Sequence, residues 1–171
     1  MKSARTKVLG SLLVATLAQL ALCMPAQACG VLVRITYGED YPDWFLVEFI
    51  NGADFELVGL DIDLNGSVGS ALIDTPYSQR SEQNANNVVL ADTLGFERGS
   101  RRMGFKFQNF LASKSYSLSV DLDGVADQLE NAELFGATAV AHLKRPDGEP
   151  LTLQGKFDKD AVVELGNRTC A

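Results

Sequence analysis

Residues 58–65 read VGLDIDLN, and this stretch decides the class of fold. Every second residue is a large apolar one, and the residues between them are small or polar. The apolar set is Val58, Leu60, Ile62 and Leu64, and the other set is Gly59, Asp61, Asp63 and Asn65. Because side chains on a β-strand point alternately to opposite faces, this period of two predicts a strand that covers a core on one side and meets solvent on the other.

The same alternation recurs on both sides of this stretch. Further strands are expected at residues 31–37, 44–50, 88–91, 103–108, 115–122, 137–143, 151–157 and 161–165. The pairs Asn51-Gly52, Asn65-Gly66, Asp123-Gly124 and Asp147-Gly148 suit tight turns between them. The pattern predicts an all-β chain, a single antiparallel β-sandwich of about eight or nine strands, immunoglobulin-like or jelly-roll-like.

Two segments depart from the strand pattern. Residues 74–87 are polar and rich in Asn, Ser and Gln, and a loop of this length is typical of a binding loop or of disorder. In residues 126–135, Leu129, Ala132 and Phe135 fit one side of a short helix, with an irregular loop as the alternative.

Residues 1–28 have the pattern of a cleaved export signal. Lys2, Arg5 and Lys7 precede an apolar run over residues 8–22, and small residues at Ala26 and Ala28 close it. The run is shorter than the ~20 residues of a membrane span, so no transmembrane anchor is expected after cleavage. We therefore expect a mature domain over residues 29–171 in the periplasm or outside the cell.

Charge and composition argue against a nucleic-acid-binding function and against a disordered chain. Cleavage changes the net charge from -7 to -10, because the leader carries three basic residues and no acidic one. An acidic surface repels nucleic acid, so a nucleic-acid partner is not expected. A hydrophobic content of 46% argues against disorder and for one domain with its own core.

The cysteines agree with export. Cys23 lies in the leader, which leaves Cys29 and Cys170 to form one disulfide in an oxidising compartment. The alternative is lipid attachment at Cys23 or Cys29. Leu22 is bulky where a lipoprotein signal needs a small residue, and residues 26–28 lack the usual aliphatic residue, so the disulfide is the favoured reading.

Carboxylates supply the main candidate chemistry. Four of them surround the turn at Gly124, and oxygen ligands at this spacing suit Ca²⁺: Asp121, Asp123, Asp127 and Glu130. A solvated acidic turn is the alternative. Asp61 and Asp63 begin an EF-hand-like run, but Leu72 stands where the closing glutamate belongs.

A ligand-binding surface is the other candidate. Tyr41, Trp44 and Tyr77 are expected to stack on sugar rings, and Arg101 and Arg102 to dock a carboxylate-bearing glycan or a neighbouring protein. The alternatives are that Trp44 caps the edge of the core and that the arginines form local ion pairs in a solvated turn. The single histidine, His142, is expected to be a hydrogen-bonded strand residue.

Several short motifs occur in a characteristic order. They are residues 49–51 (FIN), 58–64 (VGLDIDL), 72–75 (LIDT), 104–110 (GFKFQNF), 117–123 (SLSVDLD) and 134–137 (LFGA). In this order the chain resembles a secreted bacterial β-sandwich module of the aggregation-factor-core-like type, found in surface and matrix proteins. The resemblance implies an extracellular or surface module without a catalytic set.

These observations predict an exported, non-catalytic binding or structural module of the cell surface, periplasm or extracellular matrix. It is expected to bind a surface glycan or another surface protein in adhesion, with assistance from Ca²⁺. The alternative is a secreted, glycosidase-like hydrolase that uses a carboxylate pair, which needs two carboxyl groups across a cleft and a raised pKa on one of them.

Overall fold

The computed structural model describes residues 30–39, 43–75, 87–124 and 130–167. Within these ranges the chain is mostly β with antiparallel sheets, and the expected all-β class is confirmed. The two short helices are single 3₁₀ turns, η1 (Leu64–Gly66) and η2 (Asn131–Leu134). The strands are β1 (Val31–Gly38), β2 (Trp44–Asn51), β3 (Glu56–Asp63), β4 (Leu72–Thr75), β5 (Val89–Leu94), β6 (Arg102–Gln108), β7 (Lys114–Ser119), β8 (Asp121–Asp123), β9 (Thr138–Lys144), β10 (Pro150–Lys156) and β11 (Val162–Asn167).

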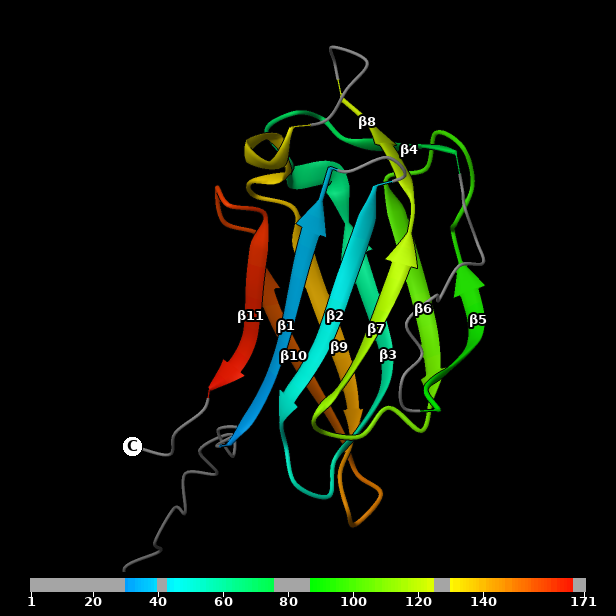
Figure 1. Cartoon of the computed structure of the whole chain (residues 1–171), viewed down its shortest axis with the longest axis vertical. Coiled ribbons are helices and arrows are strands. Elements are labelled where there is room, and N and C mark those ends of the chain that lie inside the picture. Colours follow the sequence, from blue (N-terminus) through cyan, green and yellow to red (C-terminus); the bar gives the residue numbers. More distant parts are fainter. Residues whose placement is uncertain (1–29, 40–42, 76–86, 125–129, 168–171) are drawn as a thin grey trace, which may run out of the picture.

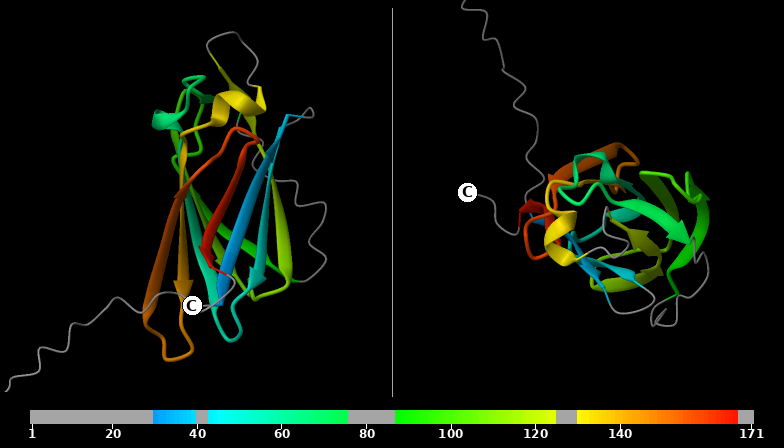
Figure 2. Two further views of the ribbon diagram at one scale, coloured as in Figure 1. Left: turned by 90° about the vertical axis from the view of Figure 1, so that its left-hand side faces the viewer. Right: turned by 90° about the horizontal axis from the view of Figure 1, so that it is seen from above.

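The strands form two larger sheets and one small one. A four-stranded sheet has the order β11-β1-β2-β7, a five-stranded sheet has the order β10-β9-β3-β6-β5, and β4 pairs with β8. Figure 1 shows the four-stranded sheet in front of the five-stranded one. Figure 2 shows that η1 and η2 lie at the same end of the molecule.

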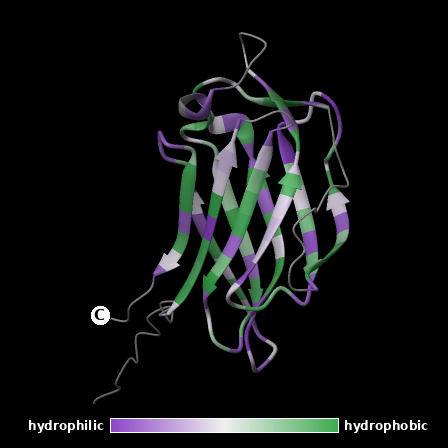
Figure 3. Cartoon of the chain, in the orientation of Figure 1, coloured by the Kyte–Doolittle hydropathy of each residue, from purple (hydrophilic) through white to green (hydrophobic). Residues whose placement is uncertain are grey.

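The larger sheets share one core. Hydrophobic residues alternate along their strands (Figure 3), and the buried set draws on both sheets. Phe107 of β6 contacts Tyr116 of β7 with ring centroids 5.5 Å apart, and Phe45 of β2 contacts Phe157 at 6.0 Å. The first pair joins the inner faces of the two sheets, and the second packs the connection between β10 and β11, where Phe157 lies, onto the four-stranded sheet.

The inward-facing residues follow the expected alternation except near register shifts, as at Leu32 of β1, which is buried together with both of its neighbours. In β3, Leu60 and Ile62 are buried, but Val58 is only half-buried and Leu57 takes its place in the core. The cause is a register shift against β9 between Leu57 and Gly59. An irregularity of this kind inserts an extra residue into one strand, so the alternation changes phase there.

Two segments fold differently from the expectation. The predicted strand over residues 115–122 is divided into β7 and β8, because the backbone N–H of Val120 donates to the carbonyl of Asp43 at 2.9 Å. The predicted loop over residues 74–87 is wrong at its start, where Asp74 and Thr75 belong to β4. Residues 76–86 lie outside the described ranges.

The expected helix is a single 3₁₀ turn in its described part. Leu134 is fully buried, whereas Phe135 is 49% exposed, so the expectation that Phe135 lines the packed side is wrong. The reason is the tight 3₁₀ geometry, which orients side chains differently from an α-helix. Leu129 lies outside the described residues.

The first and last strands pair with each other. Val31 of β1 lies opposite Asn167 of β11 in an antiparallel pair. Cys29 and Cys170 lie outside the described residues, two positions before Val31 and three after Asn167. Opposite Cα atoms of such a pair are about 4.5–5.5 Å apart, and each extended residue spans up to about 3.6 Å, so this register leaves the two cysteines within reach of one bond.

We predict that the mature protein carries the Cys29–Cys170 disulfide. Replacing both cysteines by serine should lower the free energy of unfolding by about 4–5 kcal/mol, because the bond closes a loop of nearly the whole domain. Urea denaturation measures this change, and reduced wild-type protein should match the variant. Two free thiols in a non-reducing peptide map would contradict the prediction.

Candidate functional site

The outer face of the five-stranded sheet carries a cluster of charged side chains. Burial of Leu60 and Ile62 on the inner face turns Asp61 and Asp63 of β3 outward. Their neighbours across the sheet come from β6 and β9. Asp63 accepts from Arg102 Nε at 3.0 Å, and Asp61 Oδ2 lies 2.7 Å from His142 Nε2.

Two glycines make room on this face. Gly59 lies opposite both Lys106 and His142, and Gly104 lies opposite Asp61. A Cβ at Gly104 would lie 2.7 Å from Asp61 Oδ1, so only glycine lets the carboxylate rest over β6. The result is an open depression of about 360 Å³. Its lining residues are Asp61, Ile62, Asp63, Leu94, Gly95, Arg102, Met103, Gly104, Thr138 and Val140.

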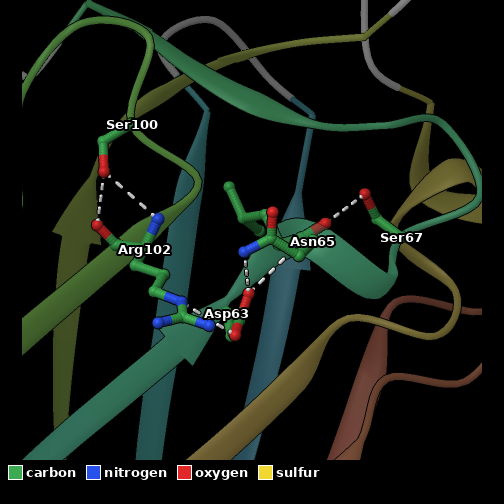
Figure 4. Close-up of polar contacts among 6 residues, drawn as sticks. Asp63, Asn65, Ser67, Ser100 and Arg102 are labelled. Atoms are coloured by element: carbon green, nitrogen blue, oxygen red, sulfur yellow. Dashed lines mark hydrogen bonds and ion pairs between the residues drawn. The ribbon is translucent and has the colours of Figure 1, made fainter.

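The Asp63–Arg102 pair is held by the turn that follows β3. The backbone and side-chain amides of Asn65 both donate to Asp63 Oδ1, at 2.9 and 2.7 Å (Figure 4). Burial opposes ionisation of Asp63, but these hydrogen bonds and the charge of Arg102 together hold its pKa below the usual range. The Ser100 hydroxyl donates to the carbonyl of Arg102 at 2.7 Å and fixes the start of β6.

The basic residues near β6 are divided among separate partners. Arg98 pairs with Asp74 at 2.6 Å, Arg102 with Asp63, and Lys106 with Asp92 at 3.0 Å. The hydrogen bond from Lys106 and its charge lower the pKa of Asp92. Arg101 is half-buried and is not among the residues that line the depression. The alternative of local ion pairs is therefore confirmed for Arg102, which is also the arginine that lines the depression.

His142 is a strand residue on the outer face, as expected, and its hydrogen bond to Asp61 confirms the predicted role. Because a carboxylate can only accept, Nε2 carries the proton in this contact.

Trp44 lies on the other sheet. Its indole packs against Gly38 of β1, where a Cβ would lie only 2.3 Å from Trp44 Cε2. It shares the outer face with Glu48, as the alternation predicts, and is not part of the buried core, so it does not cap the core edge. Tyr41 and Tyr77 lie outside the described residues. Among the predicted ligand-binding residues, Trp44 and Arg102 are therefore separated on the two sheets.

The acidic end of the molecule gathers around Asp43. Asp43 Oδ2 accepts from the Tyr37 hydroxyl at 2.8 Å and from the Leu122 backbone at 3.0 Å. Burial, and then the charges of Glu39 and Asp123, raise the pKa of Asp43. Burial, followed by Asp43 and Asp74, raises the pKa of Asp121. These carboxylates crowd one another at the junction of β1, β2 and β8.

This crowding changes the predicted set of calcium ligands. Asp121 and Asp123 are held on β8, but the carboxylates that influence the pKa of Asp121 are Asp43 and Asp74. Glu130 is exposed, and Asp127 lies outside the described residues. Within the described ranges no group of three or more acidic, histidine or cysteine residues is arranged to hold a metal ion. Sequence reasoning missed Asp43 and Asp74, because contacts between distant segments bring them there: β4, which contains Asp74, pairs with β8, and Asp43 accepts hydrogen bonds from the backbone of Val120 and Leu122.

No known protein family, curated protein or solved structure matches this chain. Within the described residues no helix has both the length and the apolar character needed to cross a membrane.

The raised pKa values of Asp43 and Asp121 predict an unusual pH dependence. A carboxyl whose pKa is raised by folding stabilises the fold at low pH, and this contribution is lost as the pH rises through the folded pKa. Asp63 and Asp92 have lowered pKa values, so their contribution is lost only below about pH 4. The contribution of Asp43 and Asp121 to the free energy of unfolding should therefore increase as the pH falls from neutral toward the ordinary carboxyl range near about pH 4.

Urea denaturation across this pH range tests the prediction. Asp43→Asn keeps an oxygen that accepts from Tyr37 but has no charge to desolvate, so it should be more stable than the wild type at neutral pH and depend less on pH. Asp160→Asn, at an exposed site, is the matched control. An Asp43→Asn variant whose stability changes with pH in the same way as that of the wild type, between neutral pH and about pH 4, contradicts the prediction.

Proposed function

We propose that this chain is an exported, non-catalytic binding module of the cell surface, periplasm or extracellular matrix, and that the depression over Gly104 is its ligand site. The observation that carries the proposal is the arrangement of Asp61, Asp63 and Arg102 around a floor at Gly104 that has no side chain; His142 contributes only through its hydrogen bond to Asp61. Sites that combine an apolar wall with a few fixed polar groups are typical of ligand recognition.

We further propose that the two larger sheets form an immunoglobulin-like β-sandwich. In immunoglobulin domains the first, second and fifth strands share a sheet, and the third, sixth and seventh form the other. Here β1, β2 and β7 are neighbours, as are β3, β9 and β10. The strands β6 and β5 extend the second sheet beyond β3, where variable domains carry their additional strands. This order favours the immunoglobulin-like alternative over the jelly roll.

A surface glycan is the ligand class that fits this site best. Sugars offer hydroxyl groups that donate and accept, and C–H faces that pack on apolar side chains. Leu94 is 52% exposed beside the depression and supplies an apolar wall. The Arg102 side chain is 75% exposed and engages Asp63 through Nε, and its guanidinium carries further N–H donors for a sugar carboxylate or hydroxyl. Another surface protein is the alternative partner.

The hydrolase alternative is less well supported at this site. A glycosidase needs a carboxyl group with a raised pKa to act as general acid. In the pair that borders the depression, the pKa of Asp63 is lowered.

We predict that Arg102→Gln weakens glycan binding about tenfold, the loss expected when a hydrogen bond to a charged group is removed. A glycan array with mature protein identifies the ligand, and calorimetry measures the affinity. Arg34→Gln is the matched control, since it makes the same charge change on the four-stranded sheet, where Arg34 pairs with Glu164. Equal loss in both variants would contradict the site, and cleavage of the bound glycan would favour the hydrolase.

A second proposal concerns Ca²⁺ at the acidic end. The observation that favours it is that Asp43 and Asp121 are carboxylates whose pKa values are raised by burial and then by neighbouring carboxylates, a cost of ionisation that a divalent cation bound with Asp123 would relieve.

We predict weak binding, with Kd on the order of 10⁻⁴ to 10⁻³ M, as in extracellular modules. Calorimetry with Ca²⁺ should show binding that Asp123→Asn reduces. Asp127→Asn should reduce the binding if the ligands are the ones predicted from the sequence, and should leave it unchanged if the site is built on Asp43. Asp92→Asn, on the five-stranded sheet, is the control. If no variant changes the response, or the wild type shows none, the cluster is a solvated turn.

A further inference from the structure

This chain has Asn-Gly pairs at residues 51–52 and 65–66, and the two pairs differ in their hydrogen bonds and packing. Asn51 is the last residue of β2 and Gly52 follows it, whereas Asn65-Gly66 lies in η1. In such a pair the backbone nitrogen of the glycine can attack the asparagine side-chain amide, because glycine has no side chain to shield that nitrogen or to restrict the backbone.

At Asn51 the reacting groups are already in contact. The Gly52 N–H donates to Asn51 Oδ1 at 2.9 Å, and this side-chain oxygen is the acceptor that the structure shows for it. Asn51 is exposed, so solvent reaches the amide. The atom that reacts is Cγ of the same side-chain amide, so this hydrogen bond holds the Gly52 nitrogen beside the carboxamide that it attacks.

Packing keeps a glycine at position 52. Its φ is +146°, and a Cβ there would lie 2.6 Å from the ring of Phe49, which is fully buried. A larger residue would displace a core aromatic side chain. The fold therefore retains the reactive partner of Asn51 for reasons of packing.

At Asn65 the same dipeptide is protected. Both amides of Asn65 donate to Asp63 Oδ1, so the side chain is held back toward β3 (Figure 4). Gly66 is confined as well, because a Cβ there would lie 2.6 Å from the Gly136 carbonyl oxygen. The 3₁₀ backbone and these contacts keep the Gly66 nitrogen from reorienting toward the amide carbon.

We propose that Asn51 is a site of spontaneous deamidation in the folded protein and that Asn65 is not. The Gly52 nitrogen forms a bond to Asn51 Cγ and gives up its proton, the Cγ–Nδ2 bond breaks, and ammonia leaves. Solvent water then opens the cyclic imide to aspartate or isoaspartate. The isoaspartate product lengthens the backbone by one methylene where Asn51 pairs with Leu32, and both products add a negative charge.

Incubation of the mature protein in mildly alkaline buffer, followed by peptide mapping and isoaspartate labelling, tests the proposal. In the folded protein Asn51 should react roughly tenfold faster than Asn65, and in urea the two rates should converge. Asn51→Gln should remove the signal at position 51 and leave the rate at Asn65 unchanged. Equal rates in the folded protein, or an Asn51 that reacts only in urea, would overturn the proposal.

Discussion

The structure depends on the contact between the apolar inner faces of its two larger sheets. Phe45 and Phe157 meet on one side of this contact, and Phe107 and Tyr116 on the other. Burial of such rings is the main favourable term in folding, and it fixes which residues of each strand point inward. Because successive side chains of a strand point to opposite faces, the residues between the buried ones must face solvent, and the same contact therefore also determines the outer surface.

The side chains that face solvent on the five-stranded sheet form charge pairs. On the five-stranded sheet, acidic and basic side chains of neighbouring strands meet in pairs, and glycine stands between them at two positions. Exposed pairs of this kind contribute little to stability. Their positions on a rigid sheet instead give a surface with fixed donors and acceptors, which is the property that recognition requires.

The alternation of apolar and polar residues predicted the strands well, because it follows directly from which side chains are buried and which are exposed. It placed Asp61 and Asp63 outward and Leu60 and Ile62 inward, as the structure has them. It failed where distant segments decide the outcome. The register shift between Leu57 and Gly59 is set by pairing with β9, and the four residues of β4 become a strand only through β8.

The candidate site was also predictable only in part. His142 and Arg102 were recognisable from the sequence, but their partners were not, because the residues of each pair are far apart along the chain. Asp43 precedes a strand and carries no motif, yet it joins Tyr37 to the backbone of Leu122. Such a role follows from tertiary structure alone, since it joins segments that are far apart along the chain.

The pairing of β1 with β11 also determines how the domain responds to mechanical load. The start of β1 and the end of β11 lie at the same end of an antiparallel pair, so tension applied through the two ends of the domain pulls these strands apart from that end (Figure 1). Hydrogen bonds in such a pair run perpendicular to the strands and are then loaded one after another, as in a zipper, rather than together in shear. The Cys29–Cys170 bond predicted above lies just beyond these ends in the sequence and would carry that tension, so the β1–β11 pair would open in this way only after the bond is reduced.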